Sequence, residues 1–141
     1  MTDSNSTIKV NELSIGYQSK KESVVITRDI RFSIEEGELT AIVGSNGIGK
    51  STLLRTLAKI QPALSGTIEI HEKALSDYND LDLAKSISLV LTDPMASKNM
   101  TVSEIIALGR QPYTNWIGTL TNNDIAKVKE VIQMVGLEEL A

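Results

Sequence analysis

A glycine-rich run, Gly44-Ser45-Asn46-Gly47-Ile48-Gly49-Lys50-Ser51, constrains this chain more than any other feature of its sequence. The run has the pattern Gly-x4-Gly-Lys-Ser, and its glycines let the backbone curl until successive N–H groups point inward at anionic oxygens. A helix that begins near Lys50 adds its positive dipole end, Lys50 adds a mobile charge, and the Ser51 hydroxyl is a hard oxygen ligand suited to Mg²⁺. The pattern therefore predicts a P-loop, which holds the phosphates of a nucleoside triphosphate. The plain alternative is a glycine-rich surface turn in front of an ordinary helix.

The residues on both sides of this run supply the context that a P-loop needs. Residues 39–43 form a near-continuous apolar run, Leu-Thr-Ala-Ile-Val, which is typical of a buried strand. Residues 51–59 predict a helix in which Leu53, Leu54, Leu57 and Ala58 fall on one face. This context favours phosphate binding over the surface turn.

Strands are expected early in the chain and helices late. Alternating apolar and polar residues predict strands over 8–15, over 24–34 with an interruption at 27–29, and over 67–70, and a further buried strand is expected over 87–91. Two helices have visible start signals, because Thr101 forms a capping box with Glu104 and Thr121 plays the same part for residues 122–135. Gly136 is expected to end the second of these helices.

Composition narrows the classes of function. The 141 residues carry a net charge of -4, which argues against broad binding to nucleic acid or to an anionic membrane surface. No apolar run approaches the length that spans a bilayer, and the polar start lacks the features of a signal peptide, so any membrane association is expected to go through a partner. Cysteine is absent, which excludes disulfides and thiolate chemistry.

The wider text around the loop resembles one family of P-loop proteins. Residues 44–54, with the Asn-Gly pair and the Ser-Thr-Leu-Leu that follows, closely resemble the Walker A segment of ABC ATPases. Residues 36–44 look like the approach to that loop, and residues 13–17 look like the first strand and the A-loop, in which an aromatic ring stacks on adenine. The resemblance favours Tyr17 as this stacking platform, because a flat amphipathic ring suits a purine. On the residues alone, Tyr17 could equally be a strand-end tyrosine packed on the domain.

The later part of the chain resembles one subgroup of that family. Residues 100–113, which end Leu-Gly-Arg-Gln-Pro-Tyr, and residues 116–118 look like the start of the helical subdomain in importers of ferric siderophores, haem and cobalamin. In the family this region faces the membrane-spanning subunits. Tyr113 and Trp116 are either part of that contact or loop residues that pack on the flanking helices.

The resemblance implies a fold, a set of ligands and a set of partners. The expected fold is α/β, a P-loop NTPase (RecA-like) core with an antiparallel β subdomain at the N-terminus and the start of a helical subdomain. Residues 1–93 would form the N-terminal part of the ATP-binding core, and residues 94–141 the Q-loop region and the start of the helical subdomain. The expected ligands are ATP and Mg²⁺, and the expected nucleotide-binding residues are Tyr17, Gly44, Ser45, Asn46, Gly47, Ile48, Gly49, Lys50, Ser51 and Thr52.

The same resemblance implies where the protein works. The partners are the membrane-spanning permease subunits of an importer, with a ferric siderophore or related iron complex as cargo, and a second copy of the ATP-binding subunit. The location is cytoplasmic, peripheral on the inner face of the cell membrane. Two other interpretations stay open, a soluble P-loop kinase or GTPase and a module that binds nucleotide without turnover.

The chain departs from the family pattern in two ways. At the position of the Q-loop glutamine of ABC ATPases, this sequence has Thr92-Asp93. Asp93 is therefore a candidate Mg²⁺ ligand beside Ser51, and the alternative is that Asp93 is a turn residue before Pro94. The signature motif, the Walker B aspartate, the catalytic glutamate and the switch histidine have no counterpart, and His71 is expected to be an exposed turn residue. No catalytic residue is therefore expected in this sequence. Because phosphoryl transfer needs a group that orients the attacking water, negligible hydrolysis is expected from these 141 residues alone.

Overall fold

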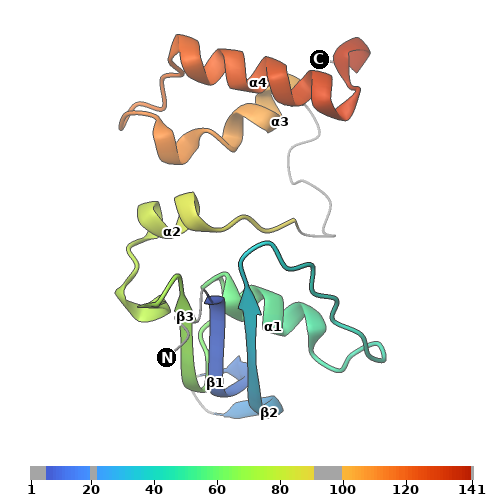
Figure 1. The fold of residues 1–141 in the computed structure, drawn as a ribbon, viewed down its shortest axis with the longest axis vertical. Coiled ribbons are helices and arrows are strands. Elements are labelled where there is room, and N and C mark those ends of the chain that lie inside the picture. The colour runs from blue at the N-terminus through green and yellow to red at the C-terminus, as the bar shows by residue number, and fades with distance from the viewer. Residues whose placement is uncertain (1–5, 20–21, 91–99, 141) are drawn as a thin grey trace. The chain divides into compact units, whose positions relative to one another are not determined.

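A computed structural model describes residues 6–19, 22–90 and 100–140 of the chain. The chain divides into two compact units, Met1–Leu89 and Val90–Ala141, which are described separately (Figure 1). In the part of the chain that the structure describes, no helix has the length and apolar character needed to cross a membrane.

The first unit is built on a four-stranded antiparallel sheet in the order β2-β1-β3-β4. Its strands are β1 (Ser6–Gln18), β2 (Ser23–Glu35), β3 (Ser65–Ile70) and β4 (Lys73–Ala74). The strands expected over 8–15, 24–34 and 67–70 are confirmed, and β1 and β2 are longer than expected. The interruption expected at 27–29 is a register shift within a continuous strand, where Asp29 has φ 55°.

A register shift also decides which side chains of β1 enter the core. Val10 is buried, but so are Leu13 and Ile15, which a regular alternation would place on the opposite face. Glu12 has φ 50° and lies in the shifted register between Val10 and Leu13, so the strand changes the face it buries at this point. The change keeps apolar side chains in the core on both sides of the bulge.

Helix α1 (Lys50–Leu57) packs against this sheet and shares its core (Figure 1). It buries Leu53 and Leu57 as expected, whereas Leu54 is 41% exposed. The short η1 (Leu75–Asp77) and α2 (Asp80–Ser86) complete the unit. The buried apolar cluster consists of Val10, Leu13, Ile15, Leu53, Leu57, Ile68, Ile70, Leu75, Tyr78 and Leu83.

The second unit contains α3 (Val102–Leu108), η2 (Gln111–Tyr113), α4 (Asn122–Val135) and η3 (Glu138–Leu140). Both expected helix starts are confirmed, because Thr101 with Glu104 and Thr121 with Asp124 each form a complete capping box. Gly136 ends α4 in the left-handed conformation, with φ 68°. Local signals a few residues long therefore set the ends of these helices.

The prediction of buried strands over 39–43 and 87–91 is wrong for the described residues. Residues 39–43 and 87–90 are irregular, and Leu39, Val43 and Val90 are 98%, 91% and 94% exposed. A strand is stabilised by hydrogen bonds to a neighbouring strand and by burial of its side chains. Among the described residues, neither segment pairs with a strand of the sheet, and although Ile87 packs partly buried against the core, the apolar sequence alone does not make these segments strands. Residue 91 lies outside the described residues.

Candidate phosphate-binding site

The candidate site is the loop of residues 44–49 together with the first turn of α1. Gly47 and Gly49 have φ of 82° and 107°, which side chains rarely adopt, so the loop needs glycine at both positions. Gly49 is the N-cap of α1, and among the described residues no side chain caps this end of the helix. The backbone N–H groups of the first turn therefore lack the usual side-chain acceptor and suit an anion.

Lys50 is held across the start of the same loop. Its Nζ donates hydrogen bonds to the carbonyl oxygens of Gly44 at 2.7 Å and of Ser45 at 2.8 Å. These two contacts place a positive charge at the loop, where Coulomb attraction to an incoming phosphate is strongest at short range. These acceptors are neutral carbonyls, and no ion pair of Lys50 is found among the described residues, so its charge is available for a phosphate.

Tyr17 reaches α1 through its hydroxyl group. The Tyr17 hydroxyl lies 3.4 Å from Thr52 Oγ1, and either group can donate this long hydrogen bond. Tyr17 is 51% exposed and Thr52 is 4% exposed, so the ring of Tyr17 keeps a solvent-facing surface close to the first turn of α1. The structure thus brings Tyr17 to the same place as Lys50, Ser51 and Thr52, which are 33 or more positions away in sequence.

Strand β2 supplies support for the loop that sequence reasoning missed. Thr27 Oγ1 donates a hydrogen bond to the carbonyl oxygen of Ile48 at 3.2 Å. A Cβ atom added to Gly49 would meet Ile26 Cγ2 at 2.8 Å and Ile15 Cδ1 at 3.5 Å. No local pattern in the sequence indicates this contact, because the interruption at residues 27–29 corresponds to a different register shift, at Asp29.

Of the two candidate Mg²⁺ ligands, only Ser51 can be placed. It is exposed in the first turn of α1, whereas Asp93 and the neighbouring Thr92 lie outside the described residues. The described residues contain no group of three or more His, Cys, Asp or Glu side chains that could hold a metal ion. A hydroxyl from a loop of this kind fits Mg²⁺, which keeps several waters and is commonly shared with substrate phosphates. His71 is exposed in a turn with φ 48°, as expected.

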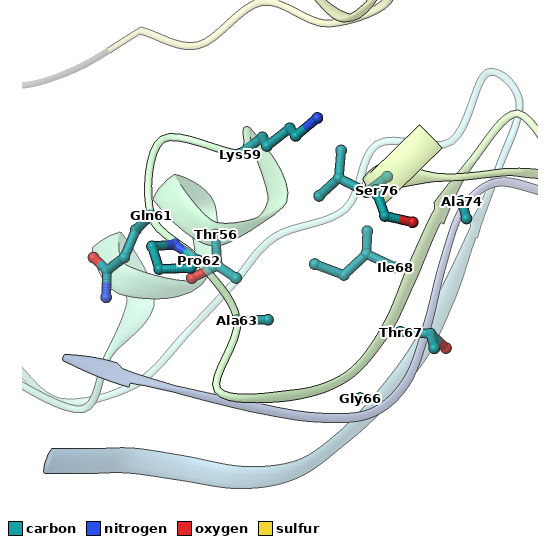
Figure 2. A pocket seen from close by; sticks show the side chains of 11 residues that line it. Thr56, Lys59, Gln61, Pro62, Ala63, Gly66, Thr67, Ile68, Ala74 and Ser76 are labelled. Carbon is teal, nitrogen blue, oxygen red and sulfur yellow. The ribbon is translucent and has the colours of Figure 1, made fainter. Parts of the chain in front are cut away.

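A separate cavity of about 350 Å³ lies between the turn after α1 and strand β3 (Figure 2). No P-loop residue lines it. Three of its polar side chains bind the protein backbone: Lys59 Nζ donates to the Tyr78 carbonyl, Gln61 to the Gly16 carbonyl and Thr56 to the Thr52 carbonyl. Of these bonds, the one from Gln61 joins the turn after α1 to strand β1, so the cavity has a structural role at this junction.

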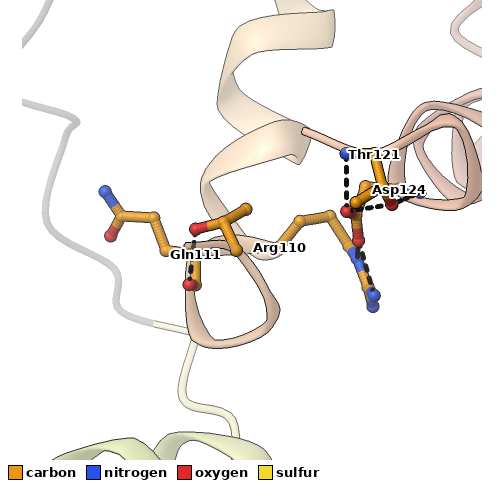
Figure 3. A network of polar contacts seen from close by, with 5 residues as sticks. Arg110, Gln111, Thr121 and Asp124 are labelled. Atoms are coloured by element: carbon orange, nitrogen blue, oxygen red, sulfur yellow. Dashed lines mark hydrogen bonds and ion pairs between the residues drawn. The ribbon is translucent and has the colours of Figure 1, made fainter. Parts of the chain in front are cut away.

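Arg110, Thr121 and Asp124 form a polar clasp between η2 and the start of α4 (Figure 3). Arg110 Nε and Nη2 each lie 2.8 Å from Asp124 Oδ1, and the guanidinium stacks 4.1 Å from the centroid of the Tyr113 ring. Thr121 donates to the other Asp124 oxygen through its hydroxyl and its backbone N–H, at 2.6 and 2.9 Å. The hydrogen bonds from Thr121, followed by the one from Arg110, hold the pKa of Asp124 below its ordinary value of 3.8, although burial acts in the opposite direction.

The clasp fixes the base of a loop that exposes apolar side chains. Tyr113, Trp116 and Ile117 are 49%, 94% and 67% exposed. Of the two interpretations of these aromatic residues, packing on the flanking helices does not fit Trp116, whereas Tyr113 is about half buried and stacks with Arg110.

Comparison with known proteins defines the class. The family described as ABC transporter matches residues 27–141. Because this match covers most of the chain, the protein belongs to the ABC transporter family. The resemblance noted in the sequence is thereby confirmed, and the kinase and GTPase alternatives are not favoured.

Individual relatives agree with this assignment. The chain is 37% identical over 133 residues to an uncharacterized ABC transporter ATP-binding protein of Methanocaldococcus jannaschii, covering 94% of this chain and 44% of the relative. It is 31% identical over 134 residues to the iron(3+)-hydroxamate import ATP-binding protein FhuC of Bacillus subtilis, covering 95% of this chain and 48% of the relative. The chain thus spans about half the length of the curated relatives it matches.

Solved structures show the same fold. The chain is similar to cbiO1 from Clostridium perfringens, described as part of the ABC transporter complex cbiONQ, with 30% identity and a TM-score of 0.72 over 96% of this chain and 53% of that chain. The expected fold class is confirmed, an α/β cassette with an antiparallel sheet at its N-terminus.

Proposed function

We propose that this chain binds Mg²⁺–ATP at residues 44–52 and serves as the nucleotide-binding part of an ABC importer. The observation that carries the proposal is the loop itself, in which two glycines with positive φ lead into an uncapped helix N-terminus and Lys50 Nζ lies across the loop. Membership of the ABC transporter family supports ATP as the ligand.

Each residue of the site has a distinct part in this proposal. Backbone N–H groups of the loop and of the first turn of α1 bind phosphate oxygens, and Lys50 leaves the loop carbonyls to bind the outer phosphates. Ser51 supplies one oxygen to Mg²⁺, which neutralises phosphate charge when bound. Tyr17 stacks on the base, with Thr52 holding its hydroxyl.

The cargo and partners are proposed from the relatives. FhuC of Bacillus subtilis is an import protein for iron(3+)-hydroxamate, so a ferric siderophore or a similar iron chelate is the proposed cargo. The proposed partners are membrane-spanning permease subunits at the inner face of the membrane and a second ATP-binding subunit. The exposed side chains of Tyr113, Trp116 and Ile117 fit the permease contact, because interface anchors are rich in aromatic residues.

Replacing Lys50 tests the nucleotide site. Lys50→Ala removes a charge-assisted contact to phosphate, so the Kd for Mg²⁺–ATP should rise by at least about tenfold. Lys129→Ala is the matched control, because it removes the same charge from an exposed position of α4. Isothermal titration calorimetry would measure both variants. Unchanged affinity of Lys50→Ala, or equal losses in the two variants, would contradict the assignment.

A further inference from the structure

Strand β2 contains a bulge directly beside the P-loop. Ile15 of β1 pairs with Thr27, but the next residue, Gly16, pairs with Val25, so Ile26 is an extra residue in β2. In a regular strand, neighbouring side chains point to opposite faces of the sheet. Here the neighbouring side chains of Ile26 and Thr27 both approach Gly49. A Cβ on Gly49 would lie 2.8 Å from Ile26 Cγ2 and 3.5 Å from Thr27 Oγ1. The bulge therefore aims two consecutive side chains at the loop, a use of bulges that is common near functional sites.

The Thr27 hydroxyl binds one particular peptide of the loop. Its Oγ1 donates to the Ile48 carbonyl oxygen at 3.2 Å. The peptide that joins Ile48 to Gly49 is trans, so its carbonyl oxygen and the Gly49 N–H point in opposite directions. Holding the oxygen toward Thr27 therefore directs the Gly49 N–H away from β2.

This peptide needs such a restraint. It lies between Gly47 and Gly49, both with positive φ, in a stretch whose glycines can adopt many conformations. Within the loop, the Ile48 N–H donates to the Ser45 carbonyl oxygen at 3.4 Å, which is long for this kind of bond. An N–H group that is already oriented binds an anion with a smaller loss of conformational entropy.

We propose that Thr27, placed by the bulge at Ile26, is a positioning residue that presets the Ile48–Gly49 peptide for phosphate binding. The inference rests on the proposed function of the loop, and it deepens that proposal by assigning a role to a residue outside the P-loop motif. Thr27 acts through the backbone and does not touch the nucleotide. Its loss should therefore weaken binding of the phosphates and leave the contact with the base unchanged.

Two ligands separate these effects, Mg²⁺–ATP and Mg²⁺–tripolyphosphate, which has no base. Thr27→Val keeps the shape of the side chain but removes the hydroxyl, so the Kd of both ligands should rise about three- to tenfold. Thr27→Ser restores the hydroxyl and should bind both within about twofold of the wild type. Thr67→Val is the matched control, an exposed threonine of β3. Tyr17→Ala should weaken binding of ATP but not of tripolyphosphate.

The outcomes distinguish this inference from the proposed function. Wild-type affinity in Thr27→Val, or equal weakening in Thr27→Ser and Thr27→Val, would overturn the role of the hydroxyl and leave the nucleotide site intact. A wild-type chain that binds neither ligand would overturn the proposed function and this inference with it. Thermal unfolding shows whether each variant is folded, and Thr27→Ala, which removes the hydroxyl without a new branch, takes the place of Thr27→Val if that variant is not.

Discussion

Gly49 is the residue on which the loop, the helix and the sheet meet. It ends the loop with φ 107° and caps α1, and a Cβ here would come within 2.8 Å of Ile26 Cγ2, so Ile26 would have to shift. A side chain at this position would strain the backbone and also push β2 away from the loop. Two separate physical effects therefore require glycine here.

Gly49→Ala and Gly47→Ala separate these two effects. Gly47 has a φ of 82° with open space around it, so Gly47→Ala carries backbone strain alone, about 1 kcal/mol. Gly49→Ala adds a contact at 2.8 Å with Ile26 Cγ2 and should lower the free energy of unfolding by about 1–3 kcal/mol. Urea denaturation measures both losses. If Gly49→Ala were no more destabilising than Gly47→Ala, the close contact with β2 would be unimportant.

At the scale of elements, the clasp of Arg110, Thr121 and Asp124 joins η2 to the first turn of α4. The carboxylate of Asp124 completes the capping box of α4 and also accepts a hydrogen bond from the guanidinium of Arg110. Asp124 is 2% exposed, and its partners favour its charged form. The clasp should therefore depend on the ionisation of Asp124.

The stability of the protein should consequently decrease in acid. In the folded protein the pKa of Asp124 lies below 3.8, so the unfolded chain binds its proton more readily. The stabilisation is fully present above pH 3.8 and is lost as the pH falls through the folded-state pKa. Asp124→Asn should be less stable than the wild type at neutral pH, and the difference should shrink in acid. Urea denaturation between roughly pH 6 and pH 2 measures it; parallel pH profiles of the two proteins would contradict the role of Asp124.

The elements that could be predicted from sequence are those specified by nearby residues. The starts of α3 and α4 depend on Thr101 and Thr121 with a partner three residues later. The phosphate-binding role of residues 44–51 rests on a short motif and stays a prediction. The bulge at Ile26 depends on the pairing of β2 with β1, and the Thr27 contact depends on that bulge, so neither could be predicted from a local pattern. The strand predicted over residues 39–43 is wrong for a related reason. An apolar run indicates that a strand is possible, but not that a partner strand is present.

The apolar segments without strand partners affect how one chain interacts with another. Leu39 and Val43 are almost fully exposed at the entrance to the P-loop, and Ile42 is 43% exposed. Residues 39–43 combine high strand propensity with no charge and no proline or glycine. An exposed segment of this kind tends to pair with another chain.

We therefore expect the chain to self-associate through residues 39–43. Sedimentation velocity over a range of concentrations should show a sedimentation coefficient that rises with concentration. Val43→Lys places a charge in this segment and should lower the association, because charged side chains oppose pairing at exposed strand edges. Trp116→Lys is the matched control, since Trp116 is 94% exposed but lies in a loop of the second unit. If Trp116→Lys reduced association as much as Val43→Lys, general hydrophobic contact rather than strand pairing would hold the chains together. A wild-type chain that stays monomeric throughout the range would exclude both mechanisms.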